Sequence, residues 1–159
     1  MGSFAQPSKS IFVRPAWMDE GPALSALAME AKAHWGYDDA FMELCRPELT
    51  VTRNKIGRER VRVAEAAGEL VGFSSLRVGE RKAWVENLFI RPGFIGKGVG
   101  HLLIRELIEY TRRHGILLVH VEADPNATDF YEREGFSLCG EVPSGSIPGR
   151  MLPLMELRF

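Results

Sequence analysis

The fold of this chain is decided by the stretch Ile90-Arg91-Pro92-Gly93-Phe94-Ile95-Gly96-Lys97-Gly98-Val99-Gly100-His101-Leu102-Leu103. An apolar, strand-like run at residues 84–90 leads into the glycines, and apolar side chains then recur at the spacing of a helix as far as Tyr110. The start of a helix presents unpaired N–H groups and a partial positive charge, and glycines let an anion approach them closely. The stretch therefore predicts a phosphate-binding site between a strand and a helix.

Three known phosphate-binding loops differ in their spacing. A P-loop needs Lys and then Ser or Thr after its second glycine, but residues 99–100 are Val-Gly, so the P-loop is excluded. A dinucleotide-binding fingerprint, Gly-x-Gly-x-x-Gly, finds its first pair in Gly96 and Gly98, whereas His101 holds the third position. Glu122 lies where a ribose-binding carboxylate is expected, so this second alternative is weakened and stays open.

The third pattern is Arg/Gln-x-x-Gly-x-Gly/Ala after a strand that ends in Val/Ile-x-Pro. Residues 90–92 (Ile-Arg-Pro) and 98–100 (Gly-Val-Gly) fit this pattern, and Lys97 lies directly before the glycines. Ile95 occupies the position of the Arg or Gln, which is a departure from the pattern.

A second block of sequence, residues 124–136, follows a strand-like run. Its local pattern predicts a short helix that Asn126 caps and Gly135 ends. The same block fits Asn-x-x-x-Phe-Tyr-x-x-x-Gly-Phe, with Phe130 and Tyr131 in the aromatic positions. Each block alone is a weak signal, but the two together, in this order and at this separation, are a strong one.

With these two blocks the chain resembles the GNAT superfamily of N-acetyltransferases, from about Ile11 to Phe159. The resemblance implies an α+β fold with a central, mixed, mostly antiparallel sheet of about seven strands and helices on both faces. It implies transfer of an acetyl group from acetyl-CoA, as cosubstrate, to a primary amine by direct attack in a ternary complex. We expect a flexible N-terminal segment, residues 1–10, and a single domain, residues 11–159.

The resemblance also implies the residues that bind the cosubstrate. The backbone groups of Leu88, Phe89 and Ile90 would bind the pantetheine arm and polarise the acetyl carbonyl, since a fixed N–H stabilises a developing oxyanion. The other residues implied are those of the loop and the second block: Ile95, Gly96, Lys97, Gly98, Val99, Gly100, His101, Asn126, Phe130 and Tyr131.

Two catalytic residues are expected. Tyr131 matches the family position that protonates the departing thiolate, and a phenol stays protonated at neutral pH. The acceptor amine is mostly an ammonium, so a base is needed as well. Glu86 is the candidate, because strand alternation predicts that it lies on the same face as Leu88, two residues later.

The resemblance implies that the acceptor enters between the first two expected helices, where the aromatic run at residues 34–37 places His34, Trp35 and Tyr37. Arg150 could pair with a carboxylate of the acceptor. A small-molecule amine is favoured over a protein substrate, because the chain has neither a basic tail nor an evident peptide groove. Two alternatives stay open: a protein or peptide N-acetyltransferase, and a non-catalytic CoA-binding sensor or interaction module.

Hydrophobic periodicity and turn residues predict the elements. A helix is expected to open at Asp19 or Glu20, and Asn126 is expected to begin the last, short one. Strands are expected at residues 11–14, 60–66, 70–77, 83–90, 117–121, 136–142 and 152–158, and further helices at residues 38–45 and from 99 onward.

Composition narrows the function further. The chain has 159 residues and a net charge of −1, so it is expected to bind neither nucleic acid nor a membrane as an obligate partner. Cys45 and Cys139 lie far apart without a metal-binding spacing, which suits reduced thiols in a cytoplasmic protein. We expect this protein to be a monomer or a homodimer. The histidines at His101, His114 and His120 show no ligand spacing with one another or with either cysteine, so no metal is expected.

Overall fold

The structure is a computed structural model that describes residues 10–159. Residues 1–9, nearly all of the predicted N-terminal segment, lie outside that range. Helices and strands follow each other as β1 (Ile11–Pro15), α1 (Gly21–Ala33), α2 (Asp39–Leu49), α3 (Arg53–Arg58), β2 (Arg60–Ala66), β3 (Glu69–Val78), β4 (Lys82–Ile90), α4 (Val99–Arg113), β5 (Leu118–Glu122), α5 (Thr128–Arg133), β6 (Ser137–Pro143) and β7 (Met151–Arg158).

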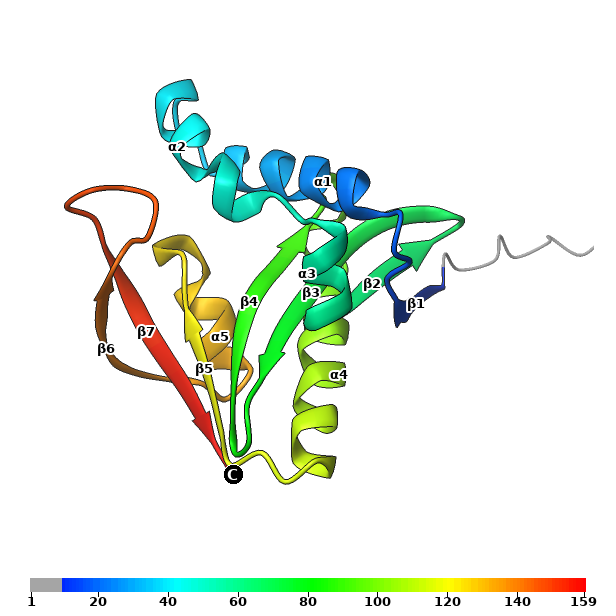
Figure 1. The fold of residues 1–159 in the computed structure, drawn as a ribbon, viewed down its shortest axis with the longest axis vertical. Helices are drawn as coiled ribbons and strands as arrows, with labels where there is room; N and C mark the ends of the chain where they lie inside the picture. The colour runs from blue at the N-terminus through cyan, green and yellow to red at the C-terminus, as the bar shows by residue number, and fades with distance from the viewer. Residues whose placement is uncertain (1–9) are drawn as a thin grey trace, which may run out of the picture.

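The strands form one seven-stranded sheet in the order β1-β2-β3-β4-β5-β7-β6 (Figure 1). All neighbouring strands pair antiparallel except β4 and β5, which pair in parallel. The predicted mixed, mostly antiparallel sheet is therefore confirmed. The dinucleotide-binding alternative is excluded, because that fold requires a mainly parallel sheet.

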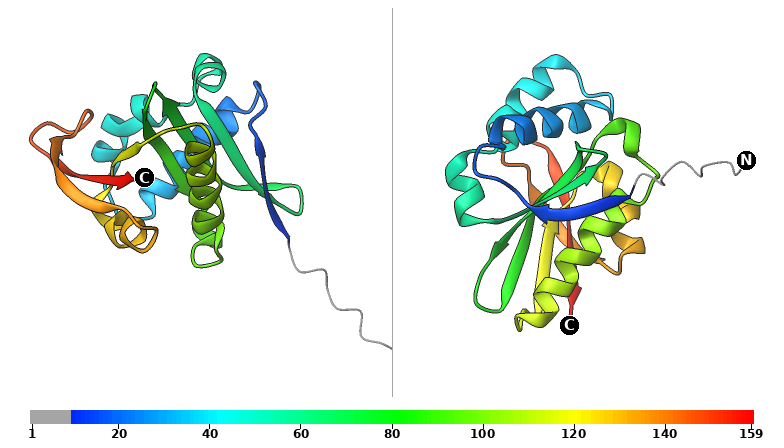
Figure 2. Two further views of the ribbon diagram at one scale, coloured as in Figure 1. Left: turned by 90° about the horizontal axis from the view of Figure 1, so that it is seen from below. Right: turned by 90° about the vertical axis from the view of Figure 1, so that its right-hand side faces the viewer.

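Helices cover both faces of the sheet, as predicted. Apolar side chains of α1, α2 and α3 pack on one face, in a cluster around Phe73 and Val63. Apolar side chains of α4 pack on the other face, against β1 to β5, and Tyr131 of α5 joins them. Figure 2 shows from two further directions how α4 lies along the sheet. No helix within residues 10–159 has the length and apolar character needed to cross a bilayer.

The hairpin between β2 and β3 turns where the sequence predicts it. Ala67 and Gly68 both have positive φ, 50° and 78°. A two-residue turn of this kind matches the twist of the strands on either side. The register that follows pairs Ala66 with Glu69 and places Val63 and Phe73 opposite each other in the core.

The strands β4 and β5 diverge, and this divergence creates the cleft. Their pairing runs from Lys82 and Leu118 to Val85 and Val121 and then stops. Beyond this point β4 continues to Ile90 alongside β3, while β5 follows β7. Figure 1 shows the green β4 and the yellow β5 spreading apart toward the top of the view.

Two observed helices, α2 and α3, depart from the prediction. The second helix does not end at Cys45 but continues to Leu49, because both side chains are buried in the cluster on that face. The short helix α3 was not predicted, although Thr52 caps it by accepting a hydrogen bond from the Lys55 N–H at 3.1 Å, and Ile56 buries its apolar side.

Candidate active site

A cleft of about 830 Å³ lies where β4 and β5 diverge. One end is formed by the glycine loop and the first turn of α4, residues 95–96 and 98–101. The other end reaches Glu48 of α2, Lys55 of α3 and Gly145 of the β6–β7 loop. The cleft therefore connects the predicted phosphate-binding loop with the opposite side of the sheet.

Glycines in the loop are needed for two different reasons. Gly96 and Gly98 have φ of 78° and 83°, and a side chain added at either position would meet no other atom. They allow the left-handed backbone that leads into α4, whose N-cap is Gly98. Gly100 is needed for packing, because a Cβ there would lie 3.1 Å from the ring of Phe130. The result is a helix start with open backbone N–H groups at one end of the cleft.

Most of the predicted cofactor-binding residues line this cleft, and Lys97 is the exception. The Lys97 ammonium instead lies over the ring of Phe94, 5.2 Å from its centre. His101 lines the cleft, but its Nδ1 pairs with the Glu134 carboxylate at 2.6 Å. The residues that do line it are Leu88, Phe89, Ile90, Ile95, Gly96, Gly98, Val99, Gly100, His101, Asn126, Phe130 and Tyr131.

The backbone of β4 offers hydrogen-bonding groups to the cleft. Arg91 donates its N–H to the Val71 carbonyl of β3 at 2.8 Å. In an antiparallel pair the groups of every second residue point the same way, so those of Phe89 also point to β3. The groups of Leu88 and Ile90 then point toward the divergence from β5, where none of the described strands pairs with them. Of the three predicted backbone contacts, Leu88 and Ile90 are the two with this orientation.

Tyr131 lines the cleft from α5 and is 5% exposed. Its ring lies edge-on to Phe130 and Phe136, with ring centres 5.2 and 5.4 Å away. Burial raises the pKa of the Tyr131 hydroxyl above its usual value. The hydroxyl therefore stays protonated throughout the neutral pH range, on a ring that is closely packed.

The prediction that Glu86 shares a face with Leu88 is wrong. Val85 and Asn87 pair with neighbouring residues of β3, so Glu86 is the extra residue of a β-bulge. A bulge inserts one residue into the alternation and changes the direction of a side chain. The Glu86 carboxylate accepts a hydrogen bond from Arg77 Nε at 2.7 Å.

The partner of Glu86 identifies the face on which it lies. The Arg77 guanidinium lies over the Trp84 ring at 4.1 Å, whereas Leu88 packs in the clusters around α4. Glu86 and Leu88 therefore point to opposite faces. Glu86 still lines the cleft, on the side of α2 and α3.

Beside Glu86 lies a polar group that sequence reasoning missed. Asn87 Nδ2 donates to Ser75 Oγ at 2.7 Å, and both residues are buried. Burial raises the pKa of the nearby Glu59 carboxyl, and the negative charge of Glu86 acts in the same direction. Ser75 and Asn87 lie on different strands, and Glu59 lies directly before β2. Their positions in the sequence therefore gave no sign that they lie together.

A second unpredicted residue, Asp124, connects the side chains expected at the acceptor entrance. Its carboxylate accepts hydrogen bonds from Lys32 Nζ at 2.8 Å, from the Tyr37 hydroxyl at 2.9 Å and from Asn126 Nδ2 at 2.9 Å. Burial alone would raise the pKa of Asp124, but the hydrogen bonds from Lys32 and the Asn126 backbone N–H outweigh it and lower the pKa. The carboxylate is therefore ionised and held in place.

This network corrects the predicted role of Asn126 and gives the position of Arg150. Asn126 does not cap α5, whose N-cap is Ala127 without a side-chain hydrogen bond. The Asn126 amide instead donates to Asp124 and Tyr37. Arg150, predicted to pair with an acceptor carboxylate, does not line the cleft; its guanidinium donates to the Tyr37 hydroxyl at 2.7 Å and lies 3.7 Å from Asp124.

The aromatic run at residues 34–37 is divided. Trp35 lines the cleft and is 45% exposed, whereas His34 lies edge-on to it and does not line the cleft. Tyr37 is held in the Asp124 network and stacks on Phe41 with ring centres 4.0 Å apart. Only Trp35 of the three predicted aromatic residues is therefore presented to a ligand in the cleft.

A family model described as the acetyltransferase (GNAT) domain matches residues 19–144. The L-methionine sulfoximine/L-methionine sulfone acetyltransferase of Pseudomonas aeruginosa is 30% identical over 117 residues, covering 68% of this chain and 68% of that protein. The N-alpha-acetyltransferase RimI of Mycobacterium tuberculosis is 30% identical over 82 residues, covering 48% of this chain and 51% of that protein. Several curated relatives match over only about half of their own length.

The fold has close counterparts among solved structures. The crystal structure of the PaiA N-acetyltransferase from Thermoplasma acidophilum in complex with coenzyme A matches with a TM-score of 0.79 and 22% identity. The match covers 94% of this chain and 99% of that chain. At this level of identity the likeness establishes the fold.

Proposed function

This chain belongs to the GNAT family of acetyltransferases, as its two sequence blocks predict, and on that premise we propose that it transfers the acetyl group of acetyl-CoA to a small primary amine. The observation that carries the proposal is the cleft itself. It joins an anion-binding helix start at one end to a group of charged side chains at the other, with unpaired β4 backbone between them.

The residues present fit acetyl-CoA. The N–H groups around Gly96 and Gly98 would hold the pyrophosphate, because the helix start supplies donors and a partial positive charge. The free backbone groups of Leu88 and Ile90 would hold the pantetheine arm and hydrogen-bond the acetyl carbonyl. When bound, the cosubstrate supplies an acetyl thioester to this cleft.

Tyr131 is the proposed general acid. Its hydroxyl stays protonated in its buried position and lies on the cleft wall, so it can give a proton to the departing sulfur. The edge-on packing against Phe130 and Phe136 holds the ring in place.

Glu86 is the proposed base, acting through water. Its position on the side of α2 and α3 puts it near the end of the cleft where the acceptor would enter. The Arg77 guanidinium fixes the direction of the carboxylate at 2.7 Å. An acceptor amine arriving as an ammonium would lose its proton toward this carboxylate before it attacks.

Carboxylates at the acceptor end support a cationic acceptor. Glu48 and Glu86 line this end beside Lys55, and the positive charge of Lys32 at the acceptor entrance is paired with Asp124. The Glu48 carboxylate lies directly against Gly145, where a Cβ would overlap it. An ammonium would be attracted to this end of the cleft and guided toward Glu86.

A protein N-terminus is the second candidate acceptor. The similarity to the N-alpha-acetyltransferase RimI favours it, whereas the longer match to the methionine sulfoximine acetyltransferase favours a small amine. The proposal commits to the small amine, because the latter match covers 68% of both chains.

The test is a thiol-release assay with acetyl-CoA, comparing pooled small amines with pooled peptides that carry free N-termini. We expect turnover with the small amines and a lower kcat/KM in Glu48→Gln. The matched control is Glu43→Gln, which removes an exposed carboxylate that pairs with Arg46 on the same helix. Turnover with peptides alone would contradict the acceptor class. Binding of CoA without turnover on any amine would indicate a sensor.

A further inference from the structure

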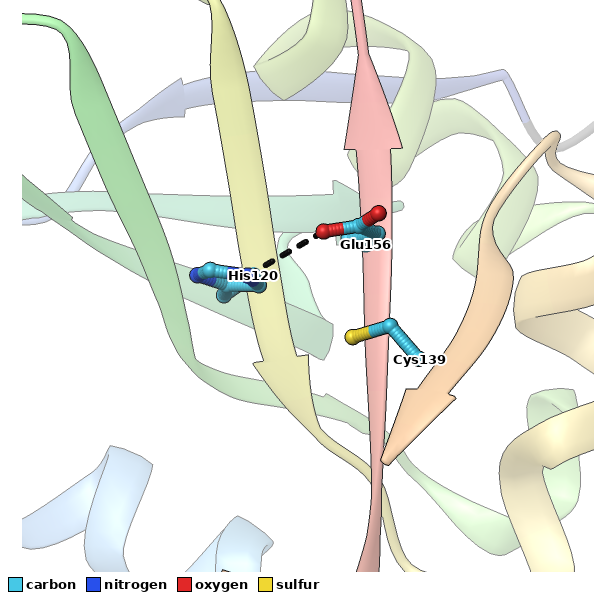
Figure 3. Close-up of side chains that lie close together, drawn as sticks. All are labelled: His120, Cys139 and Glu156. Atoms are coloured by element: carbon cyan, nitrogen blue, oxygen red, sulfur yellow. Dashed lines mark ion pairs between the residues drawn. The ribbon is translucent and has the colours of Figure 1, made fainter. Parts of the chain in front are cut away.

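Three side chains capable of binding a metal lie together outside the cleft. His120 comes from β5, Cys139 from β6 and Glu156 from β7, and one potential ligand atom of each lies within 4.8 Å of the others (Figure 3). None of the three lines the cleft. The sequence gave no sign of this group, because its members come from three strands that become neighbours only in the folded sheet.

The sheet register places two of these side chains on one face. His120 and Glu156 are directly paired across β5 and β7, so their side chains lie side by side. Their sequence neighbours Val119, Val121 and Met155 point the other way, into the core under α4. The group therefore lies on the face opposite α4, close to the point where β4 and β5 begin to diverge.

A β-bulge brings in the third side chain. Leu138 pairs with Met155 and Gly140 with Leu154, so Cys139 is an extra residue in β6. Bulges redirect side chains at sheet edges. Figure 3 shows the sulfur pointing toward His120 and Glu156.

We propose that His120, Cys139 and Glu156 bind a zinc ion. Thiolate, imidazole and carboxylate are the three ligand types that zinc takes in proteins. His120 Nε2 and a Glu156 carboxylate oxygen are 3.4 Å apart, and the edge of a tetrahedron around zinc with such ligands is about 3.4 Å. The Cys139 sulfur lies within 4.8 Å of the other two ligand atoms and stands on an exposed residue of the outermost strand, which leaves it room to adjust.

A neighbouring side chain already orients the carboxylate. Arg158 binds both oxygens of Glu156, through Nε at 2.9 Å and through a terminal nitrogen at 3.2 Å. Outer contacts of this kind fix the direction of a metal ligand. The Arg158 side chain is 70% exposed, so water screens its repulsion of a cation. Three protein ligands leave one position for water.

Such an ion would tie the edge strand β6 to β5 and β7. Of the described strands, β6 pairs only with β7, so cross-linking it through a metal would stabilise the C-terminal part of the sheet. A metal bound in the folded state alone raises the unfolding temperature in proportion to the logarithm of its free concentration.

The probe is Co²⁺, which reports a cysteine ligand through a thiolate-to-metal charge-transfer band. The full chain is freed of metal with a chelator and titrated with Co²⁺, and the Co²⁺ is then displaced with Zn²⁺. We expect one equivalent of metal, a charge-transfer band that Zn²⁺ abolishes, and a rise in the unfolding temperature with Zn²⁺.

Variants assign the ligands. Cys139→Ser should remove the band, whereas the control Cys45→Ala, which removes a buried thiol on α2, should retain it. His120→Gln and Glu156→Gln should each weaken Zn²⁺ binding by at least about 10-fold. Circular dichroism checks that the variants are folded. Absence of the band in the unmodified chain, its persistence in Cys139→Ser, or unchanged Zn²⁺ affinity in His120→Gln would overturn the proposal.

Discussion

The change Tyr131→Phe isolates the proposed acid. It removes one hydroxyl and keeps a ring that is 5% exposed and packed edge-on between Phe130 and Phe136. The ring supplies the apolar contacts, so the unfolding temperature and the affinity for acetyl-CoA should stay nearly the same. The turnover number should fall, because water would have to protonate the departing thiolate.

General acid catalysis contributes roughly 10²–10⁴-fold to a rate. At about 1.36 kcal/mol for each factor of ten, the barrier should rise by about 2.7–5.4 kcal/mol. Since burial raises the pKa of Tyr131, the hydroxyl of the unmodified enzyme stays protonated through the neutral range, and the loss in the variant should be equally large across it.

The assay is thiol release at saturating acetyl-CoA, with a rapid-quench measurement to show that acetyl transfer limits the rate. The matched control is Tyr110→Phe on α4, whose ring stacks on His114 and does not line the cleft. If Tyr131→Phe keeps the full rate of a chemistry-limited reaction, the tyrosine is not the acid. If it loses rate and stability in equal measure, the hydroxyl acts through packing.

Three further changes test other parts of the site. Glu86→Gln should leave kcat/KM rising with pH toward the pKa of the free amine, about 10.4 for a lysine-like acceptor; a pH profile identical to that of the unmodified enzyme would place the base elsewhere. Ile95→Arg puts a cation at a cleft-lining position that is 45% exposed. Calorimetry should therefore find several-fold tighter CoA binding that weakens as the salt concentration rises. An affinity that does not depend on salt would refute the contact. Burial raises the pKa of Glu59, so the ionised carboxylate lowers the stability of the folded protein at pH values above that raised pKa. This loss of stability disappears below about pH 4.3, the pKa of a glutamate in the unfolded chain. Glu59→Gln should therefore raise the unfolding temperature at about pH 8 and much less at about pH 4, and an equal rise at both would contradict the reasoning.

The fold was largely predictable because local signals agreed with one another. The turn at Ala67 and Gly68, the glycines before α4 and the helical spacing from Val99 onward each specify their element without help from the rest of the chain. The short helix α3 escaped prediction, because a single buried Ile56 is too little for a periodic pattern.

The parts of the site that the local backbone forms were predictable from the sequence. The parts that depend on contacts with distant segments of the chain were less predictable. The loop residues line the cleft because a helix start has a fixed geometry. The face of Glu86 could not be predicted, since a bulge depends on the register with β3. Asp124 was missed for a similar reason, because its partners Lys32, Tyr37 and Arg150 lie far away in the sequence.

The central claim is that this cleft carries acetyl groups from acetyl-CoA to a small primary amine. The most direct measurement is mass spectrometry of a pool of small amines after incubation with the protein and acetyl-CoA that carries an isotopic label in the acetyl group. We predict one labelled acetyl group on an amine nitrogen, released CoA in equal amount, and formation of both products slowed roughly 10²–10⁴-fold in Tyr131→Phe. If the protein binds CoA and neither the amine pool nor peptide N-termini take up the label, the account of this site as an acetyltransferase is contradicted.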